Sequence, residues 1–315
     1  MRIAVFGSGA VGGYFGARLL RAGQAVSLIA RGEHLRAIQA TGLQVSGASG
    51  EFTVIPSLAT DNPAEVGEVE LVLVGVKAWQ VAEAAELMRP LVGKNTVVLP
   101  LQNGVEAPFQ LAKALGEEVV LGGLCQISAY LAAPGKIHHV GIEPTILFGE
   151  LDGRQTARLE MIQSVFEQAG VRAQIAADIQ VALWDKFLFI AAFSAVGAAS
   201  RVGGGLILQT PPTRQLLEEV MREIWMVARA AGVPLPAEAI GRRLSFIEQM
   251  PPQAMASMAR DLLEGRPSEL EQLIGAVVRI GEQVEVATPL SRALYAALLP
   301  QEWLARRKLP LPEPQ

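Results

Sequence analysis

Residues 3–12 read Ile-Ala-Val-Phe-Gly-Ser-Gly-Ala-Val-Gly, and this stretch decides the fold. Its first four residues are typical of a buried strand, and they run directly into the glycine pattern G-x-G-x-x-G. An apolar pattern of helical period follows over residues 14–21. Glycine at position 7 permits a tight turn, glycine at 9 lets a phosphate approach the backbone, and glycine at 12 lets the helix pack against the strand. The stretch therefore predicts a strand, a phosphate-binding turn and a helix.

The context of the glycine pattern favours a dinucleotide ligand over an ordinary structural turn. A strand precedes the pattern, a helix follows it, and a second strand lies at the expected distance. The amide groups at the start of the helix would face the phosphates of the ligand. The expected contacts in this turn are Gly7, Ser8, Gly9, Ala10, Val11 and Gly12.

The end of the second strand indicates which dinucleotide is bound. An NAD-binding domain usually places Asp or Glu there, to accept hydrogen bonds from the 2′-hydroxyl of the ribose. Here Ala30 stands at the strand end and Arg31 follows it. A guanidinium suits a 2′-phosphate, so the sequence predicts NADPH (or NADP) as the cofactor. The alternative is that Arg31 is a solvated loop arginine.

The chain outside the turn predicts two domains. Short β-branched runs alternate with helical patterns over residues 1–150, as in a parallel sheet covered by helices. Beyond about residue 178 long apolar runs of helical period are separated by prolines. We predict an α/β fold with an N-terminal Rossmann domain, a doubly wound and mostly parallel sheet, over residues 1–176. An all-helical domain is expected over residues 177–315.

Several local elements follow from the same patterns. Runs at 136–140 and 145–148 predict an antiparallel hairpin that extends the sheet. The segment after Pro300 has little to bury and is expected to be frayed. The sheet strands are expected at 3–6, 25–30, 71–76 and 96–101, with a further helix at 155–169.

Composition excludes several classes of function. The formal net charge of −4, with acids and bases interspersed, argues against a nucleic-acid or membrane partner. The single cysteine, Cys125, excludes a disulfide framework and a cysteine zinc site, and no metal site is predicted. The apolar stretch 187–196 is shorter than the roughly 20 residues of a membrane helix, and the N-terminus lacks a signal-peptide pattern. We expect a cytoplasmic protein with a small-molecule partner, and a homodimer is an open alternative.

Two polar residues follow predicted strands at the sheet edge where ligands bind. Lys77 comes after the apolar run 71–76, and Asn103 comes after the run 96–101. Lys77 can bind a phosphate or carboxylate, and the amide of Asn103 can bond a carboxamide, a ribose or a substrate acid. The alternative for Asn103 is a simple Asn-Gly turn.

One lysine lies inside an apolar helical run in the second domain. A buried ammonium without a partner costs much free energy, so Lys186 either reaches outward or meets a carboxylate for a purpose. Glu269 is the candidate carboxylate, in a segment interpreted as a helix start with Ser268 as its cap. A lysine can stabilise the oxygen of a carbonyl that receives a hydride and supply its proton. The histidines, namely His34, His138 and His139, are the alternative acids and are interpreted as structural.

The order of these motifs resembles the ketopantoate reductase family over nearly the whole chain. The further motifs are Val-Lys-Ala-Trp-Gln at 76–80, Gln-Asn-Gly at 102–104, Leu-Trp-Asp-Lys at 183–186, Ser-Met-x-x-Asp at 257–261 and Gly-Arg-Pro-Ser-Glu at 265–269. The resemblance implies NADPH-dependent reduction of 2-dehydropantoate (ketopantoate), a 2-oxo acid, to pantoate in pantothenate biosynthesis. It makes Lys186 the proton donor and Ser257 a substrate-binding serine. It also makes Glu269 the acid near the lysine and the nicotinamide ribose, and Asn103 a residue of the cofactor and substrate sites.

The substrate side departs from the family pattern. Asparagines usually stand four and eight residues after the lysine, where this chain has Ile190 and Ser194, and a further asparagine is replaced by Gly204. A paralogous reductase or dehydrogenase that acts on a different, more apolar 2-oxo or 2-hydroxy acid is therefore an alternative. A dehydrogenase that oxidises a hydroxy acid or an amino-acid-like substrate, including an opine-type activity, is a second one. A non-catalytic NADP sensor is another.

Overall fold

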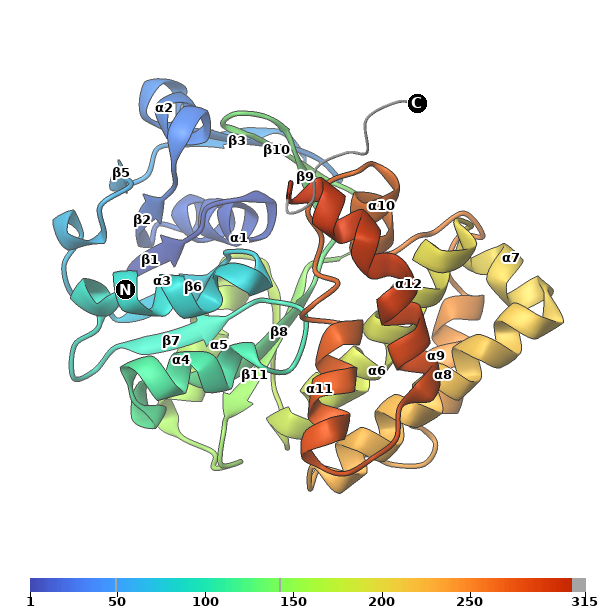
Figure 1. The fold of residues 1–315 in the computed structure, drawn as a ribbon. Helices are drawn as coiled ribbons and strands as arrows, with labels where there is room; N and C mark the ends of the chain where they lie inside the picture. Colours follow the sequence, from blue (N-terminus) through green and yellow to red (C-terminus); the bar gives the residue numbers. More distant parts are fainter. Residues whose placement is uncertain (49, 142, 308–315) are drawn as a thin grey trace. The chain divides into compact units, whose positions relative to one another are not determined.

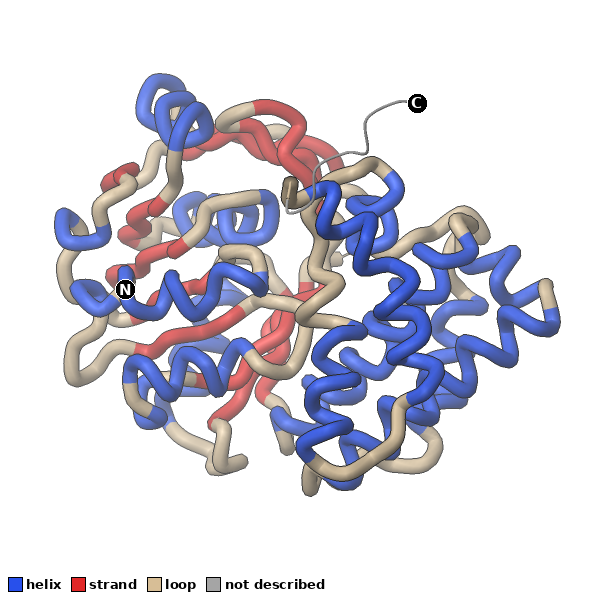
Figure 2. The backbone as a smooth tube through the Cα atoms, viewed as in Figure 1, coloured by secondary structure: helices blue, strands red, loops and turns tan. Residues whose placement is uncertain are grey.

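The computed structural model describes residues 1–48, 50–141 and 143–307, and these divide into two compact units. The first unit contains Met1–Gln102 and Glu106–Ala182, and the second contains Asn103–Val105 and the chain from Leu183 onward. The first unit combines strands and helices, whereas the described part of the second is helical (Figure 2). The predicted fold class is confirmed. The proposed domain boundary, after residue 176, lies near the end of the first unit.

A parallel sheet forms the centre of the first unit. Its strand order is β5-β2-β1-β6-β7 in the described residues, and all four pairings are parallel. The order reverses at β1, because β2 lies on one side of it and β6 on the other, which makes the end of β1 the ligand-binding position. The strands are β1 (Arg2–Phe6), β2 (Ala25–Ile29), β5 (Leu58–Thr60), β6 (Leu71–Val74) and β7 (Val97–Pro100). The helices that alternate with them are α1 (Ala10–Arg21), α2 (Gly32–Thr41), α3 (Val81–Leu87) and α4 (Ala107–Leu115) (Figure 1).

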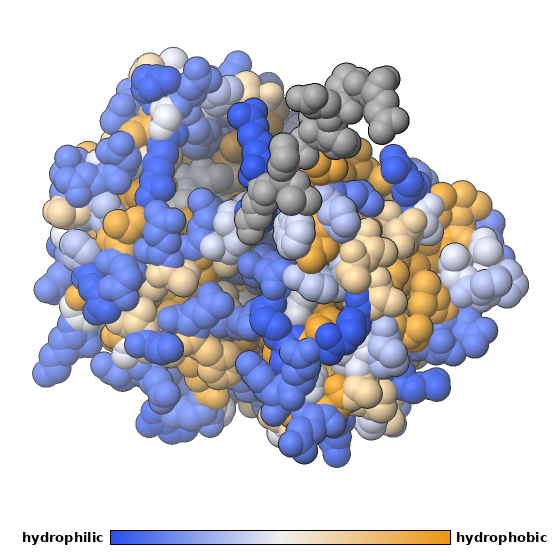
Figure 3. Space-filling view, in the orientation of Figure 1, coloured by the Kyte–Doolittle hydropathy of each residue, from blue (hydrophilic) through white to orange (hydrophobic). Residues whose placement is uncertain are grey.

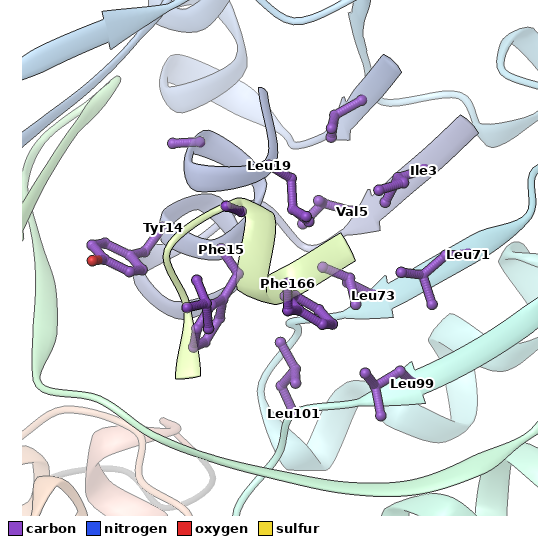
Figure 4. Close-up of a cluster of buried hydrophobic side chains, with 14 of the residues drawn as sticks. Ile3, Val5, Tyr14, Phe15, Leu19, Leu71, Leu73, Leu99, Leu101 and Phe166 are labelled. Atoms are coloured by element: carbon purple, nitrogen blue, oxygen red, sulfur yellow. The ribbon is translucent and has the colours of Figure 1, made fainter. Parts of the chain in front are cut away.

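The strands are apolar because both faces of the sheet are covered. Every residue of β6 and β7 is buried. On one face, Phe15 of α1 meets Phe166 of α5 (Ala157–Gln168) edge to face, with ring centroids 6.4 Å apart. Figure 4 shows both rings beside Val5 and Leu73 of the sheet. This core fixes α1 against β1 and so sets the position of the glycine turn between them.

The predicted hairpin of residues 136–140 and 145–148 is wrong. β10 (Lys136–His139) pairs with β9 (Ala129–Ala133) and with β3 (Leu43–Gly47), which in turn pairs with β4 (Phe52–Val54). β11 (Thr145–Glu150) pairs instead with β8 (Leu121–Gln126) and β12 (Arg172–Ile175). The tight turn lies one strand earlier, at Gly135, whose φ of +72° suits glycine.

The described part of the second unit consists of helices. The long apolar helix is α6 (Ile179–Ser200), whose first residues belong to the first unit. The others are α7 (Gly204–Gln209), α8 (Pro211–Ala230), α9 (Ala239–Glu248), α10 (Ser257–Leu263), α11 (Ile274–Gln283) and α12 (Pro289–Ala305). Prolines begin α8 and α12, where a missing amide hydrogen costs nothing.

Two expectations for this unit are wrong. The helix expected at Ser268 begins at Ile274, because Ser268 bonds to another helix and the next residues form a turn. The segment after Pro300 is not frayed over residues 301–307, since α12 continues to Ala305 and Glu302 is 3% exposed. The rest of that segment lies outside the described residues.

Helix α6 is longer than the apolar stretch 187–196 suggested. It has 22 residues, and among the described helices it alone is long and apolar enough, by length and composition, to cross a membrane. However, 72% of its most apolar window is buried inside the protein, as in a core helix. Figure 3 shows hydrophilic residues spread over the visible face of the first unit, in keeping with the interspersed charges of the sequence.

Candidate functional site

The glycine turn has the geometry that the sequence predicts for a dinucleotide. Gly7 has φ +92°, and a Cβ there would lie 2.6 Å from the backbone of Val76. A Cβ at Gly12 would lie 2.4 Å from the oxygen of Gly7, so helix and strand meet too closely for a side chain. A Cβ at Gly9 would meet nothing within 4 Å. The space above Gly9 is open, which fits the approach of a pyrophosphate to the amide groups at the start of α1.

His34 supports this turn. Its Nδ1 accepts a hydrogen bond of 3.0 Å from the amide of Gly135, so its Nε2 carries the hydrogen and donates to the oxygen of Ser8 at 2.7 Å. The imidazole of His34 therefore joins α2 and the β9–β10 turn to the phosphate-binding turn. Its two contacts are to backbone atoms, which supports the structural interpretation of this histidine.

Arg31 lies two residues after the end of β2 and is the N-cap residue of α2. Its side chain is 63% exposed, and its guanidinium faces the carboxylate of Glu83 on α3 at 4.0 Å. An exposed pair at that distance contributes little to stability. Breaking this pair, so that the guanidinium can turn toward a 2′-phosphate, therefore costs little free energy.

The loop after β6 presents Lys77, and a residue that the sequence reasoning passed over supports that loop. Lys77 is exposed, with its Nζ 5.7 Å from the ring centroid of Trp79. The buried amide of Gln102 donates to the oxygens of Val74 and Val76, at 2.8 and 2.9 Å. Its Oε1 is buried and has no hydrogen-bond partner among the described residues. Gln102 is the first residue of the Gln-Asn-Gly motif, and its place beside Asn103 was the sequence signal that could have identified it.

The second unit brings two predicted site residues together. Asn103 donates from Nδ2 to the carboxylate of Glu269 at 3.3 Å, although the two residues are 166 positions apart. Glu269 is 6% exposed. The backbone oxygen of Gln272 lies close to Gly104, because a Cβ added at Gly104 would be 3.2 Å from that oxygen. The Asn103 loop therefore packs against the segment that begins at Glu269, and the amide helps to compensate a buried carboxylate.

Lys186 is half-buried on α6, between the buried residues Leu183 and Phe187. The neighbouring Asp185 is bound by α9, through an ion pair of 3.3 Å from Arg242 and a shorter one from Arg243. The carboxylate next to Lys186 in sequence is thus committed to arginines. The pairing of Lys186 with Glu269 stays a prediction.

Ile190 and Ser194 follow Lys186 at intervals of four residues, which places them along the same side of α6. Ile190 is half-buried. Ser194 is 0% exposed, and its Oγ has no hydrogen-bond partner among the described residues. A buried hydroxyl without a partner costs free energy unless a ligand or water satisfies it.

The remaining candidates are less closely defined. Ser257 is half-buried and is the first residue of α10, and Gly204 is the buried first residue of α7. Gln272, which the sequence analysis does not single out, has a buried Oε1 without a hydrogen-bond partner among the described residues. A hollow of about 630 Å³ on α9, lined by Glu238, Arg242 and Phe246 among others, includes none of the predicted site residues.

Known proteins match both units of the chain. The family description "Ketopantoate reductase PanE/ApbA" matches residues 3–153, and "Ketopantoate reductase PanE/ApbA C terminal" matches residues 178–302. The "Uncharacterized oxidoreductase YkpB" of Bacillus subtilis is 31% identical over 300 residues, which cover 95% of this chain and 98% of that protein. A 2-dehydropantoate 2-reductase of Halobacterium salinarum is 33% identical over 297 residues, which cover 93% of this chain and 96% of that protein.

Solved structures agree. The crystal structure of a PanE/ApbA family ketopantoate reductase from Ralstonia eutropha JMP134 is 33% identical, with a TM-score of 0.89 over 97% of this chain and all of that one (100%). A D-mandelate dehydrogenase solved with NADH and anilino(oxo)acetate is 24% identical, with a TM-score of 0.89 over 97% of this chain and 99% of that one, and it shows the fold alone.

The fold and the glycine turn are those of a dinucleotide-binding protein, and the family and its relatives make it an oxidoreductase. The chain belongs to the ketopantoate reductase family, as the resemblance predicted. Family membership supports a small-molecule substrate, reduction of a 2-oxo acid, and NAD or NADP as the class of cofactor.

Proposed function

We propose that this enzyme reduces ketopantoate to pantoate with NADPH. The observation that most supports the proposal is the hydrogen bond between Asn103 and Glu269, because it joins two site residues predicted independently from distant motifs. The proposed cofactor contacts are the turn 7–12, Arg31, Lys77, Asn103 and Glu269. The proposed substrate contacts are Lys186, Asn103, Ser257, Ile190 and Ser194.

The residues of the second unit suit the chemistry at the 2-oxo group. When bound, NADPH supplies a hydride to the carbonyl carbon. The ammonium of Lys186 donates a hydrogen bond to the carbonyl oxygen and then the proton that the developing alkoxide needs. Glu269 orients that ammonium, and Asn103 fixes the carboxylate of Glu269. The half-buried position of Lys186 strengthens its interaction with the oxygen, because water screens it less.

NADPH is proposed over NADH from the end of β2. The residue there is Ala30, so a carboxylate that would bond the ribose and repel a phosphate is replaced by a methyl group. Arg31 supplies a guanidinium at the following position.

Two observations point in opposite directions on the tail of the substrate. The buried, unsatisfied hydroxyl of Ser194 favours a ligand with a polar group, such as the hydroxyl of ketopantoate. Ile190 offers no hydrogen bond where the family pattern has an amide, which favours an apolar tail. A 2-oxo acid with an apolar tail is therefore the second candidate substrate.

A substrate panel separates the two candidates. The consumption of NADPH and of NADH is measured with ketopantoate, with 2-oxo-3,3-dimethylbutanoate, which lacks the hydroxyl, and with other apolar 2-oxo acids. We expect ketopantoate to be preferred over its deoxy analogue about tenfold in kcat/KM, the effect of one satisfied hydrogen bond in a desolvated site. A preference for the deoxy analogue would select the second candidate, and no turnover despite tight NADPH binding would indicate a sensor.

Variants of α6 locate the group that binds the hydroxyl. Ser194→Ala should lower kcat/KM for ketopantoate and leave the deoxy analogue nearly unchanged. Ser200→Ala is the control, because it removes a hydrogen bond within α6, from the last residue of the helix to the oxygen of Val196. Ile190→Asn with Ser194→Asn should increase the preference for ketopantoate. If the double variant loses that preference, other residues bind the hydroxyl.

A further inference from the structure

The last turn of α12 holds one residue of the segment before α11 by hydrogen bonds. Glu302 accepts from the amide of Ser268 at 3.0 Å and from its hydroxyl at 2.6 Å. Arg306 donates to the backbone oxygen of Ser268 at 2.8 Å and to Glu302 at 2.5 Å. The amide, the hydroxyl and the carbonyl of Ser268 are thus all bound by one helical turn. We call Ser268, Glu302 and Arg306 the Ser268 network.

Ser268 immediately precedes Glu269. The hydroxyl of Ser268 also accepts from the amide of Leu270 at 3.2 Å, and the backbone oxygen of Glu269 accepts from the amide of Leu273 at 2.9 Å. The segment 268–273 is therefore fixed at its first residue by α12 and within itself by turn hydrogen bonds. The direction of the Glu269 side chain depends on the peptide that the Ser268 network holds.

The position of Glu302 is unfavourable for a carboxylate. It is 3% exposed, and it lies in the last turn of α12, where the helix dipole disfavours a negative charge. The Ser268 network compensates the burial of this carboxylate. An apolar residue at this position would pack α12 at lower cost, but it would not hold Ser268.

We propose that Glu302 is a positioning residue for Glu269. It fixes the Ser268 peptide and thereby keeps the carboxylate of Glu269 in place for Asn103 and, under the proposed function on which this inference rests, for Lys186. Glu302 does not touch the substrate. Its effect on turnover passes through Glu269.

The chain offers a matched control at the opposite end of α12. Glu223 of α8 is 5% exposed and accepts from the amides of Leu290 and Ser291, at 2.8 Å each, and from the hydroxyl of Ser291 at 2.7 Å. It is a second buried carboxylate that binds the backbone amide and the hydroxyl of a serine. These hydrogen bonds join α8 to the first turn of α12 rather than to the segment 268–273.

The experiment compares Glu302→Gln with Glu223→Gln in the full-length enzyme. Both variants should lower the melting temperature, because each weakens one buried carboxylate network. Only Glu302→Gln should lower kcat, by about tenfold, with the KM for the 2-oxo acid within about threefold. Ser268→Ala keeps the backbone donor and should lower kcat by a smaller factor, about threefold, so the test remains if Glu302→Gln folds poorly.

A double-mutant cycle identifies the route. In a Glu269→Gln background, Glu302→Gln should have no further effect on kcat, because the group it positions is already altered. Equal losses of kcat in Glu302→Gln and Glu223→Gln, or independent losses in the cycle, would overturn the proposal.

A measurement without turnover separates this inference from the proposed function. Amide hydrogen exchange in the free protein should increase at residues 268–273 in Glu302→Gln, and at 289–291 in Glu223→Gln. Unchanged exchange at 268–273 would overturn the role of Glu302 even in an active enzyme. Increased exchange there would support it even if the wild type reduced no 2-oxo acid, which would refute the proposed function alone.

Discussion

Under the proposed function, the side chain of Arg31 selects NADPH over NADH. Arg31→Ala should weaken NADPH binding about tenfold or more and NADH binding little, because only NADPH has the 2′-phosphate that a guanidinium binds. Dissociation constants measured by fluorescence titration check this. Arg36→Ala is the control, since Arg36 is an exposed arginine of the same helix paired with Glu33. Equal losses for both cofactors would remove Arg31 from the phosphate site.

Glu83, which faces Arg31, tests the same phosphate site, with a change in NADPH affinity of the opposite sign. Glu83 lies 4.0 Å from the guanidinium and would repel a bound 2′-phosphate. Glu83→Gln should therefore strengthen NADPH binding by up to about fivefold, the size of an exposed ion-pair effect. Glu86→Gln on the same helix, where Glu86 pairs with Arg89, should leave the binding of NADPH unchanged.

Lys186 and Glu269 are the residues on which turnover should depend most. Lys186→Ala should lower kcat roughly 100-fold or more with little change in NADPH affinity, because the lysine acts on an oxygen that gains charge in the transition state. Glu269→Gln should also lower kcat. If activity survives Lys186→Ala within a few fold, another group is the proton donor, and a Glu269→Gln variant like the wild type would reduce Glu269 to a structural residue.

At the scale of elements, α12 is joined to the segment 268–273 twice. Besides the Ser268 network, Tyr295 of α12 donates to the carboxylate of Glu271 at 2.6 Å. Burial, and then the hydrogen bond to Glu271, raise the pKa of the Tyr295 hydroxyl to about 12. The ordinary value in an unfolded chain is about 10.

This raised pKa predicts how stability depends on pH. Because the folded state favours the neutral phenol, the stabilisation is fully present below pH 10 and is lost as the pH rises from about 10 to about 12. After discounting for solvent at a partly exposed group, it is worth about 1 kcal/mol. The free energy of unfolding is measured against pH for the wild type and for Tyr295→Phe. The two curves should converge across that range. Parallel curves would mean that Tyr295 titrates normally.

The sequence predicted elements correctly where the signal was local, namely a run of apolar residues or a glycine pattern. The turn at 7–12 and the four expected strands of the sheet are present, since a buried parallel strand is apolar throughout. The hairpin at 136–148 was wrong because the pairing of β10 and β11 depends on strands far away in the chain. Glu302 could not be predicted either, because a charged residue near a chain end is typical of a solvated helix end, and only tertiary packing shows that it is buried.

At the scale of the whole molecule, the proposed contacts divide between the two units. The turn 7–12, Arg31 and Lys77 belong to the first unit, and Asn103, Lys186, Ser257 and Glu269 belong to the second. The loop 103–105 belongs to the second unit, although in sequence it lies between two segments of the first unit.

This division predicts additive effects on the two ligands. Arg31→Ala should change only the NADPH parameters and Ser257→Ala only the KM for the 2-oxo acid, because under the proposed function the two side chains contact different molecules. In the double variant the free-energy changes in kcat/KM should sum to within about 0.5 kcal/mol, as for sites that share no contacts. Lys186→Ala with Glu269→Gln is the contrasting pair, and its effects should be strongly non-additive because Glu269 acts through the ammonium of Lys186. Steady-state kinetics on the four single and two double variants test this directly. Coupling between Arg31 and Ser257 as large as that between Lys186 and Glu269 would show that cofactor and substrate are not bound by separate sets of residues.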